Sequence, residues 1–156
     1  MRILAVDTGA KCGWALYDNG ALSAGTWKLK KADTKKHKER YGMRFQRFYD
    51  ELQKIGKVDY VYYEEVYSHT GTKAAHSYGG FKSLLLFWCE LNGISYGSFG
   101  VGTIKKRATG KGNSDKSKMI KAANKYIKKI LKREVTSDNE ADAIWILQLA
   151  KEKHGV

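Results

Sequence analysis

Three carboxylates stand where separate structural elements are expected to begin or end. Asp7 follows the apolar run 3–6, Glu64 follows a run of Val and Tyr at 58–63, and Asp142 lies in the first turns of a C-terminal helical pattern. Each acid alone has an ordinary explanation, because Asp before Thr-Gly is common in turns and a Glu at a strand end is usually on the surface. Acids from separate elements can converge, however. On a chain of net charge +13, such a cluster indicates divalent metal used to cut a phosphate backbone.

The middle acid is one of a neighbouring pair, Glu64 and Glu65. Successive side chains of a strand point to opposite faces of a sheet. Only one of the two can therefore point in the same direction as Asp7, and the other faces solvent or a basic partner.

The C-terminal helical pattern spans 138–153, and its faces follow from the rotation of 100° per residue. Asp138 and Asp142 fall within about 40° of each other. They share their face with the apolar residues expected to pack on the sheet, which are Trp145, Ile146 and Leu149. Asn139 lies at the border of this face, and Glu140 is expected to point away.

The acids of this helix differ in how easily they are explained. Ser137 and Glu140 have the spacing of a capping box, and Asp138 suits a helix start as a cap or as an acid favoured by the helix dipole. Asp142 has no such explanation. A charged residue on a buried face needs a partner, and a metal ion at the edge of the sheet is a good one.

The charge of the chain favours nucleic acid as the partner. Lys and Arg number 29 against 16 Asp and Glu, and the basic residues concentrate at 28–47 and 105–132, with aromatics and glycines between them. Such clusters bind nucleic acid by neutralising its phosphates. Neither block forms a basic helix with an apolar back, so no membrane partner is expected.

The length of 156 residues fits a single domain, 1–156, and a hydrophobic fraction of 42% is enough for a core. The apolar start is too short for a signal peptide, and no run of about eighteen apolar residues occurs, so we expect a cytoplasmic protein. Cys12 and Cys89 stand alone and are expected to be reduced thiols.

The order of elements predicts the α/β class, with one mixed five-stranded sheet flanked by helices. A hairpin turn at 18–20 joins the second and third strands, so the first three strands are expected to be antiparallel. Strands are expected at 2–7, 13–17, 21–27, 58–64 and 94–99, and helices at 34–55, 74–91, 115–132 and 138–153. A polar loop is expected at 65–73 and a basic, glycine-rich loop at 100–113.

Several of these segments resemble one known family. The segments are Val6-Asp7-Thr8-Gly9, Tyr63-Glu64-Glu65-Val66-Tyr67 and Asp138-Asn139-Glu140-Ala141-Asp142-Ala143, together with the basic stretch 102–117. In this order they resemble the RuvC-type Holliday junction resolvases of the RNase H-like superfamily, and most of all the compact resolvases of phages and prophages. That branch would place the protein in the cytoplasm of a bacterial host.

The resemblance implies a metal site. Asp7, Glu64 and Asp142 match metal ligands of the family, which would hold two Mg²⁺ ions roughly 4 Å apart, with Mn²⁺ able to substitute. Glu64 matches better than Glu65 because it directly follows the apolar strand residues. A fourth acid of the family corresponds here to Asn139. Two alternatives stay open: Asp138 takes its place, or Asn139 binds metal through its carbonyl.

The resemblance also implies residues that contact DNA. Lys105 and Lys116 match positions near the scissile phosphate, where a cation stabilises developing charge, although simple phosphate contact is an equal alternative. Tyr67 matches an aromatic that stacks on unpaired bases, with an ordinary loop aromatic as the alternative. The candidate DNA-binding residues are Tyr67, Lys73, Lys105, Lys106, Arg107, Lys111, Lys116 and Lys118.

The implied activity is resolution of four-way and other branched DNA junctions by a homodimer that leaves 5′ phosphate ends. The dimer face would use the helix at 74–91, where Leu84, Leu85, Phe87 and Trp88 exceed one packing stripe, unless that surplus is core. Two alternatives remain. One is a related nuclease for flaps, forks or RNA–DNA hybrids, and the other is a junction-binding module with weak or no catalysis.

Overall fold

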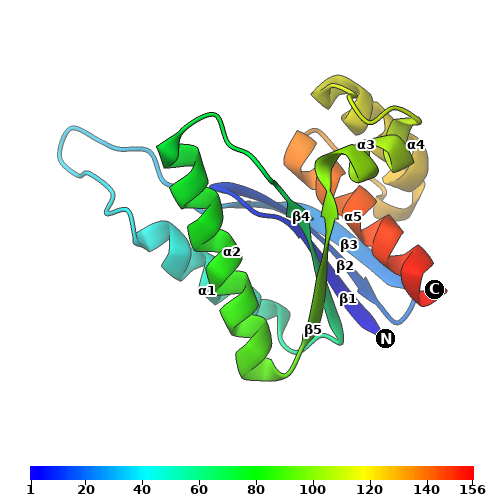
Figure 1. The fold of residues 1–156 in the computed structure, drawn as a ribbon, viewed down its shortest axis with the longest axis horizontal. Coiled ribbons are helices and arrows are strands. Elements are labelled where there is room, and N and C mark those ends of the chain that lie inside the picture. The colour runs from blue at the N-terminus through cyan, green and yellow to red at the C-terminus, as the bar shows by residue number, and fades with distance from the viewer.

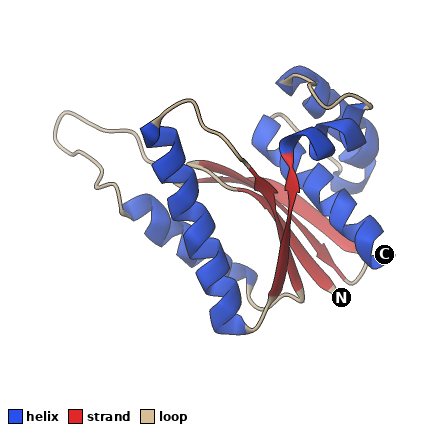
Figure 2. Ribbon diagram, in the orientation of Figure 1, coloured by secondary structure: helices blue, strands red, loops and turns tan.

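The structure is a computed structural model that describes residues 1–156, and it is built around one mixed five-stranded sheet (Figures 1 and 2). The strands are β1 (Arg2–Asp7), β2 (Lys11–Asp18), β3 (Ala21–Lys28), β4 (Tyr60–Glu65) and β5 (Ser95–Gly100), in the spatial order β3-β2-β1-β4-β5. The helices are α1 (Met43–Ile55), α2 (Thr72–Asn92), α3 (Val101–Thr109), α4 (Lys116–Leu131) and α5 (Asp138–His154). No helix combines the length and apolar character that crossing a bilayer requires.

The predicted sheet, with its first three strands antiparallel, is confirmed. β1 pairs antiparallel with β2, and β2 with β3, through a tight turn in which Asn19 and Gly20 both have positive φ, 49° and 103°. β4 lies parallel to β1, and β5 lies parallel to β4. The carboxyl ends of β1, β4 and β5 therefore meet at one edge of the sheet.

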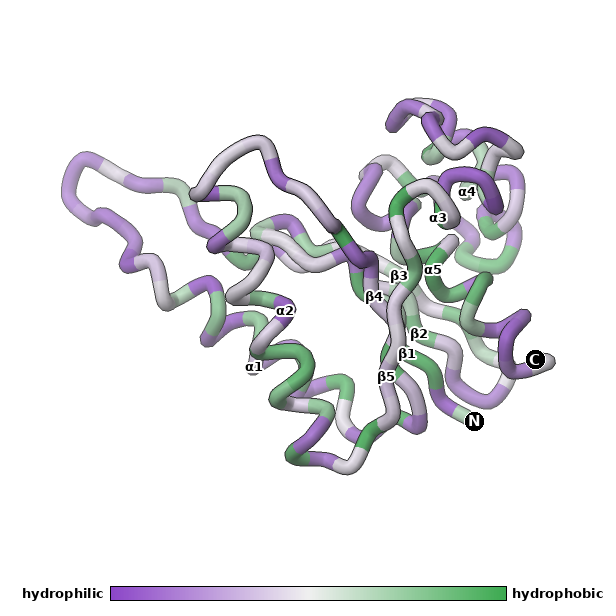
Figure 3. The backbone as a smooth tube through the Cα atoms, viewed as in Figure 1, coloured by the Kyte–Doolittle hydropathy of each residue, from purple (hydrophilic) through white to green (hydrophobic).

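Helices cover both faces of the sheet, α1 and α2 on one and α3, α4 and α5 on the other (Figure 1). Alternation along β1 divides its residues between the two cores: Leu4 and Val6 pack toward α1 and α2, and Ile3 and Ala5 toward α5. Figure 3 shows hydrophilic chain in the loop before α1 and around α4, outside these two cores.

The helix predicted over 34–55 begins only at Met43. The apolar spacing that indicates a helix begins only at Tyr41. The residues from 34 to 40 are mostly charged and exposed, so they gain little from a helical conformation. They form an exposed loop instead. Within this loop Glu39 accepts a hydrogen bond from the N–H of Lys31 and pairs with Arg47 of α1.

The loop predicted over 100–113 is wrong for most of its length, because residues 101–109 form α3. Val101, Ile104 and Ala108 have helical spacing, and Ile104 is fully buried against α5 and α4. The glycines obscured this pattern. Gly110, in the left-handed conformation at φ 82°, ends the helix with an N–H bond to the carbonyl of Lys106.

Glu140 does not point away from the protein as predicted. It is only 5% exposed and pairs with Arg133, so its carboxylate does not complete a capping box, although its N–H bonds to Ser137 Oγ at 3.4 Å. The reason is that α5 is covered on two sides, by the sheet and by α3 and α4. A calculation with a single buried face does not describe such a helix.

Gly13 of β2 allows α5 to lie directly on the sheet. A Cβ atom at this position would be 1.8 Å from the backbone carbonyl oxygen of Asn139 and 2.8 Å from the backbone nitrogen of Glu140. Gly13 is also the partner of Asp7 in the β1–β2 register. The missing side chain therefore brings the first turn of α5 next to the first candidate acid.

We expect Gly13→Ala to lower the free energy of unfolding by about 2–3 kcal/mol, because backbone rather than a mobile side chain blocks the new methyl group. Urea unfolding followed by circular dichroism measures this. Gly79→Ala is the matched control, since its Cβ meets nothing within 4 Å in the middle of α2, and it should be neutral or stabilising by about 0.5–1 kcal/mol. Equal stability of the Gly13 variant and the unmodified protein would contradict the close approach.

Candidate metal and nucleic-acid site

Asp7 and Glu64 lie side by side at the carboxyl ends of two neighbouring parallel strands. In the parallel register Val6 of β1 is paired with Tyr63 of β4, and the two acids follow directly. Both continue the alternation that points Ala5 and Tyr62 toward α5. The carboxyl groups are within hydrogen-bonding reach of each other, so the two strand ends place both acids at one point.

Glu65 faces the opposite side of the sheet. Its carboxylate pairs with Lys82 of α2 and lies 3.4 Å from the hydroxyl of Tyr78. That hydroxyl also donates to the carbonyl oxygen of Glu64 and accepts from the N–H of Val66, at 2.9 and 3.1 Å. Strand alternation thus separates the two adjacent acids, and Tyr78 fixes the backbone where β4 ends.

The first two turns of α5 add Asp138 and Asp142 to the pair on the sheet. Both carboxylates lie near enough to repel the charge of Asp7, and Asp142 is also repelled by Glu64. The structure therefore brings together all four acids that the sequence identifies, from β1, β4 and α5. Asn139 lies between the two helix acids, with its backbone against Gly13.

The acids nearest the sheet are strongly perturbed. Burial, followed by the charges of Glu64 and Asp142, raises the pKa of Asp7 well above its ordinary value of 3.8. Burial also raises the pKa of Glu64, and burial with the charges of Glu64 and Asp138 raises the pKa of Asp142 to about 7. Burial is the first cause of all three shifts. Repulsion between the acids adds to it at Asp7 and Asp142, whereas a hydrogen bond with Asp7 and the charge of Lys105 oppose it at Glu64.

The buried carboxylates of this cluster have too few hydrogen-bond partners and cations, which suits the binding of a divalent cation. Oδ1 of Asp142 is buried without any hydrogen-bond partner, and Asp7 is 9% exposed. Hard divalent cations prefer such carboxylate oxygens. No group of three or more His, Cys, Asp or Glu side chains is already arranged to hold a metal ion.

Lys105 and Lys116 both reach the acids, from α3 and from the start of α4. Lys116 Nζ lies 2.8 Å from Asp138 Oδ2. Although partial burial opposes the effect, this contact lowers the pKa of Asp138 below its ordinary value. The charge of Lys105 acts on Glu64 and Asp142. The two lysines predicted from the basic stretch therefore lie beside the acids.

The other candidate DNA-binding residues are more dispersed. Tyr67 is 87% exposed in the loop after β4, Lys73 is exposed in the first turn of α2, and Lys106 is exposed on α3. Arg107 is not a free cation, because it pairs with Glu152 of α5 and lies over the ring of Trp145 at 5.6 Å. It lies away from the acids and serves the contact between α3 and α5.

Lys111 and Lys118 line a groove of about 370 Å³ on the outer side of α4. Lys121 and Lys125 line the same groove, and sequence reasoning did not single them out. Their spacing from Lys118, three and seven residues, would have identified them as one helix face. Lys118, Lys121 and Lys125 form no close ion pair, and only Lys118 comes within 3.8 Å of an acid, Asp115.

Lys11 and Lys28 were also missed as a pair, because Lys11 stands alone in the sequence and Lys28 belongs to the separate basic block 28–47. They are paired in the β2–β3 register and line a groove of about 530 Å³ beside the start of α5. Only the hairpin register, which the predicted turn at 18–20 sets, could have placed them together.

Comparison with known proteins gives the fold. No protein-family model and no curated protein sequence matches this chain. Among solved structures, Thermus thermophilus RuvC in complex with a Holliday junction substrate is similar with a TM-score of 0.69 and 17% identity, over 94% of this chain and 90% of that one. The Fowlpox virus resolvase, in complex with substrate Holliday junction DNA, is similar with a TM-score of 0.66 and 16% identity, over 99% of both chains. The yeast mitochondrial Holliday junction resolvase Ydc2 is similar with a TM-score of 0.63 and 12% identity, over 97% of this chain and 82% of that one.

The raised pKa of Asp142 predicts that removing its charge stabilises the fold by an amount that depends on pH. Between its unfolded pKa near 3.8 and its folded pKa of about 7, the folded protein holds a proton that the unfolded chain releases, so stability falls as the pH rises. In EDTA, Asp142→Asn should therefore raise the free energy of unfolding by about 1–3 kcal/mol at pH 8 and hardly at all near pH 4.

Urea unfolding at the two pH values measures the effect. Asp50→Asn on the exposed side of α1 is the control and should change stability by less than about 0.5 kcal/mol at both. An Asp142→Asn protein that is less stable than the unmodified one at pH 8 would contradict the repulsive cluster.

Proposed function

Because the chain has the fold of the RuvC-type Holliday junction resolvases, we propose that it is a divalent-metal-dependent endonuclease that cuts four-way DNA junctions. The observation that carries the proposal is the convergence of Asp7, Glu64 and Asp142 at one edge of the sheet, where their buried charges lack compensation. A fold alone does not define an activity, and this site supplies the chemistry.

Asp7, Glu64 and Asp142 would hold Mg²⁺ through their carboxylate oxygens, with Mn²⁺ as a substitute, and Asp138 or Asn139 would complete the set. When bound, two such ions supply an activated water and stabilise the leaving 3′ oxygen, which yields a 5′ phosphate. Lys105 and Lys116 would bind the oxygens of the scissile phosphate, where charge increases during the reaction.

Several features support branched DNA as the substrate. Two of the similar structures are complexes with Holliday junctions. The net charge of +13 and the lysine groove on α4 suit a polyanion larger than one phosphate. Tyr67 lies exposed in the loop that follows Glu64, close to the proposed reaction, where an aromatic ring can stack on an unpaired base.

A homodimer would cut both strands of a symmetric junction, because two cuts require two active sites. The predicted apolar surplus on α2 is divided in the structure: Leu85 and Trp88 are core, Leu84 packs against that core, and Phe87 is 57% exposed. Leu91, which the prediction did not include, is 60% exposed. Phe87 and Leu91 lie one turn apart on the outer face of α2. We propose this exposed pair as part of the dimer contact.

The adjacent acids of β4 offer a direct test of the active site. Glu64→Gln should lower the rate of junction cleavage in Mg²⁺ by at least about a hundredfold, because it removes a metal ligand. Glu65→Gln, one residue away on the other face, should stay within about threefold of the unmodified protein. Cleavage of a synthetic four-way junction is measured on denaturing gels, with EDTA expected to abolish it.

The pattern of products separates this proposal from the alternatives. Paired symmetric nicks that depend on Glu64 support a resolvase. Cleavage of RNA–DNA hybrids or flaps with indifference to junctions would identify a related nuclease. Tight junction binding without nicks in Mg²⁺ or Mn²⁺ would leave a binding module and sink the catalytic proposal.

We expect Phe87→Asp to give a monomer, because a buried charge opposes association of apolar faces. Light scattering after size-exclusion chromatography measures the mass, and the variant should make single nicks rather than paired ones. Ile130→Asp is the control, since Ile130 is 51% exposed on α4 and should leave the mass unchanged. A dimer that survives Phe87→Asp would exclude this face.

A further inference from the structure

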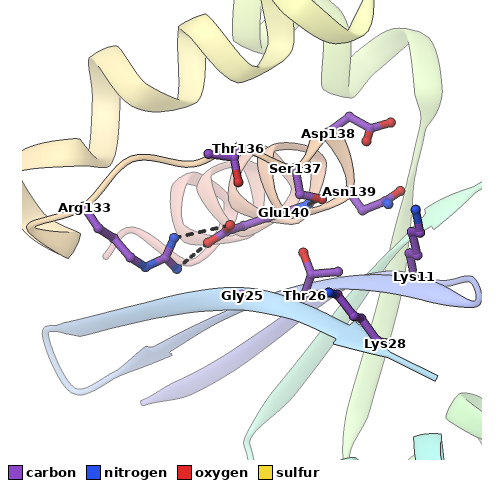
Figure 4. A pocket seen from close by; sticks show the side chains of 10 residues that line it. All are labelled: Lys11, Gly25, Thr26, Lys28, Arg133, Thr136, Ser137, Asp138, Asn139 and Glu140. Atoms are coloured by element: carbon purple, nitrogen blue, oxygen red, sulfur yellow. Dashed lines mark hydrogen bonds and ion pairs between the residues drawn. The ribbon is translucent and has the colours of Figure 1, made fainter. Parts of the chain in front are cut away.

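We propose that the groove between the β2–β3 strands and the start of α5 binds a phosphodiester of the cleaved DNA strand, next to the one that is cut. This inference rests on the proposed function and adds a substrate site to it. The groove has a volume of about 530 Å³ and no hydrophobic residue in its lining (Figure 4). Its lining includes Lys11, Thr26 and Lys28 of the strands and Asp138 and Asn139 of α5.

The floor of the groove comes from strand positions on the same face as the acids. In the β2–β3 register Lys11 is paired with Lys28, and Gly13 with Thr26. Gly13 is in turn paired with Asp7 in the β1–β2 register. Because directly paired residues point to one face, Lys11, Thr26 and Lys28 lie on the α5 side of the sheet, in line with Asp7.

The two lysines of the floor are uncompensated. Both are exposed, and neither forms an ion pair. Like charges directly opposite each other destabilise a sheet, so this pairing needs another explanation. Of the other charged residues of the groove, Arg133 and Glu140 pair with each other, and Asp138 pairs with Lys116, which lies outside it. The two lysines therefore leave the groove positive. An anion is therefore the ligand that this surface fits.

The hydroxyl of Thr26 provides an independent indication. Thr26 Oγ1 is buried and has no hydrogen-bond partner. An unsatisfied buried hydroxyl costs about 1–3 kcal/mol. A hydrogen bond donated by this hydroxyl to a phosphate oxygen would remove that cost. Figure 4 shows this side chain on the floor between the two strands and the first turn of α5.

The position of the groove connects it to the proposed chemistry. Asp138 and Asn139, both from the turn of α5 that lies on Gly13, form one side of it (Figure 4). A DNA strand whose scissile phosphate lies at the acids would pass over this turn into the groove. The phosphate that enters it would then meet Lys11, Lys28 and the hydroxyl of Thr26.

The charge part of the inference is tested with the double variant Lys11→Gln/Lys28→Gln. Its KM for a four-way junction should rise about 5- to 20-fold with kcat changed less than about twofold, and the slope of log affinity against log salt should become shallower by about 1.5. The control is Lys57→Gln/Lys153→Gln, two exposed lysines at the opposite end of the sheet, which should leave KM and slope unchanged.

Thr26→Val separates a binding role from a structural one. It keeps the shape of the side chain and removes the unsatisfied hydroxyl, so the free protein should be as stable as the unmodified one or more stable. Its KM should nevertheless rise about 3- to 10-fold, because the bond to phosphate is lost. A purely structural residue would not gain stability and lose affinity together.

Junction binding, measured by fluorescence anisotropy without cleavage, shows whether the proposed nuclease activity or the proposed phosphate groove has failed. If the unmodified protein binds junctions without cutting them, the proposed nuclease activity fails, and the variants still test the groove by affinity. If it cuts junctions and both groove variants keep their KM and salt slope, only the groove is overturned. If it binds no DNA, both proposals fail.

Discussion

The close approach of α5 to β2 is the constraint on which the rest of the site depends. A glycine at position 13 is required because the carbonyl of Asn139 occupies the space of its side chain. This contact lowers the first turn of α5 onto the sheet at the residue paired with Asp7. It therefore sets the distance between the acids of the helix and the acids of the strands, and it forms one side of the groove beside them. The hydrophobic contacts of Ala141 and Ile144 hold the helix in place but could not by themselves bring its backbone so near.

That approach has an electrostatic cost, which the surrounding residues offset only in part. Burial raises the pKa values of Asp7, Glu64 and Asp142, and repulsion raises those of Asp7 and Asp142 further, so the metal-free site opposes folding at neutral pH. Lys105 and Lys116 reduce the repulsion from outside, while the apolar core of α5 and the sheet supplies the stability that tolerates it. A site that costs stability in this way is typical of function rather than of folding.

The sequence predicts those parts of the structure that have a single strong period. Strand alternation predicted that only one of Glu64 and Glu65 points with Asp7, and the structure has the two acids on opposite faces. The turn at Asn19–Gly20 predicted the antiparallel start. The sequence-based predictions failed where a helix is buried on two sides or where two residue patterns overlap. Glycines concealed the apolar spacing of α3, and a two-sided environment buried Glu140 where one face was assumed. Lys11 and Lys28 were missed because their proximity arises from register between strands, which isolated positions in a sequence do not express.

Some of these acids already have a cation nearby and others have none. This difference bears on whether Asp138 or Asn139 acts as the fourth metal ligand. Asp138 already has a cation, since Lys116 lies 2.8 Å away and lowers its pKa, so a metal ion would gain little there without displacing the lysine. Asp142 has no partner for its buried Oδ1 and the greatest need of one. Asn139 carries no charge that would add to the repulsion, and its backbone is fixed against Gly13. An uncharged oxygen in this position limits the repulsion in a cluster that already holds three acids with raised pKa values. Of the two alternatives, the electrostatics of the site therefore favour the amide at 139 over Asp138.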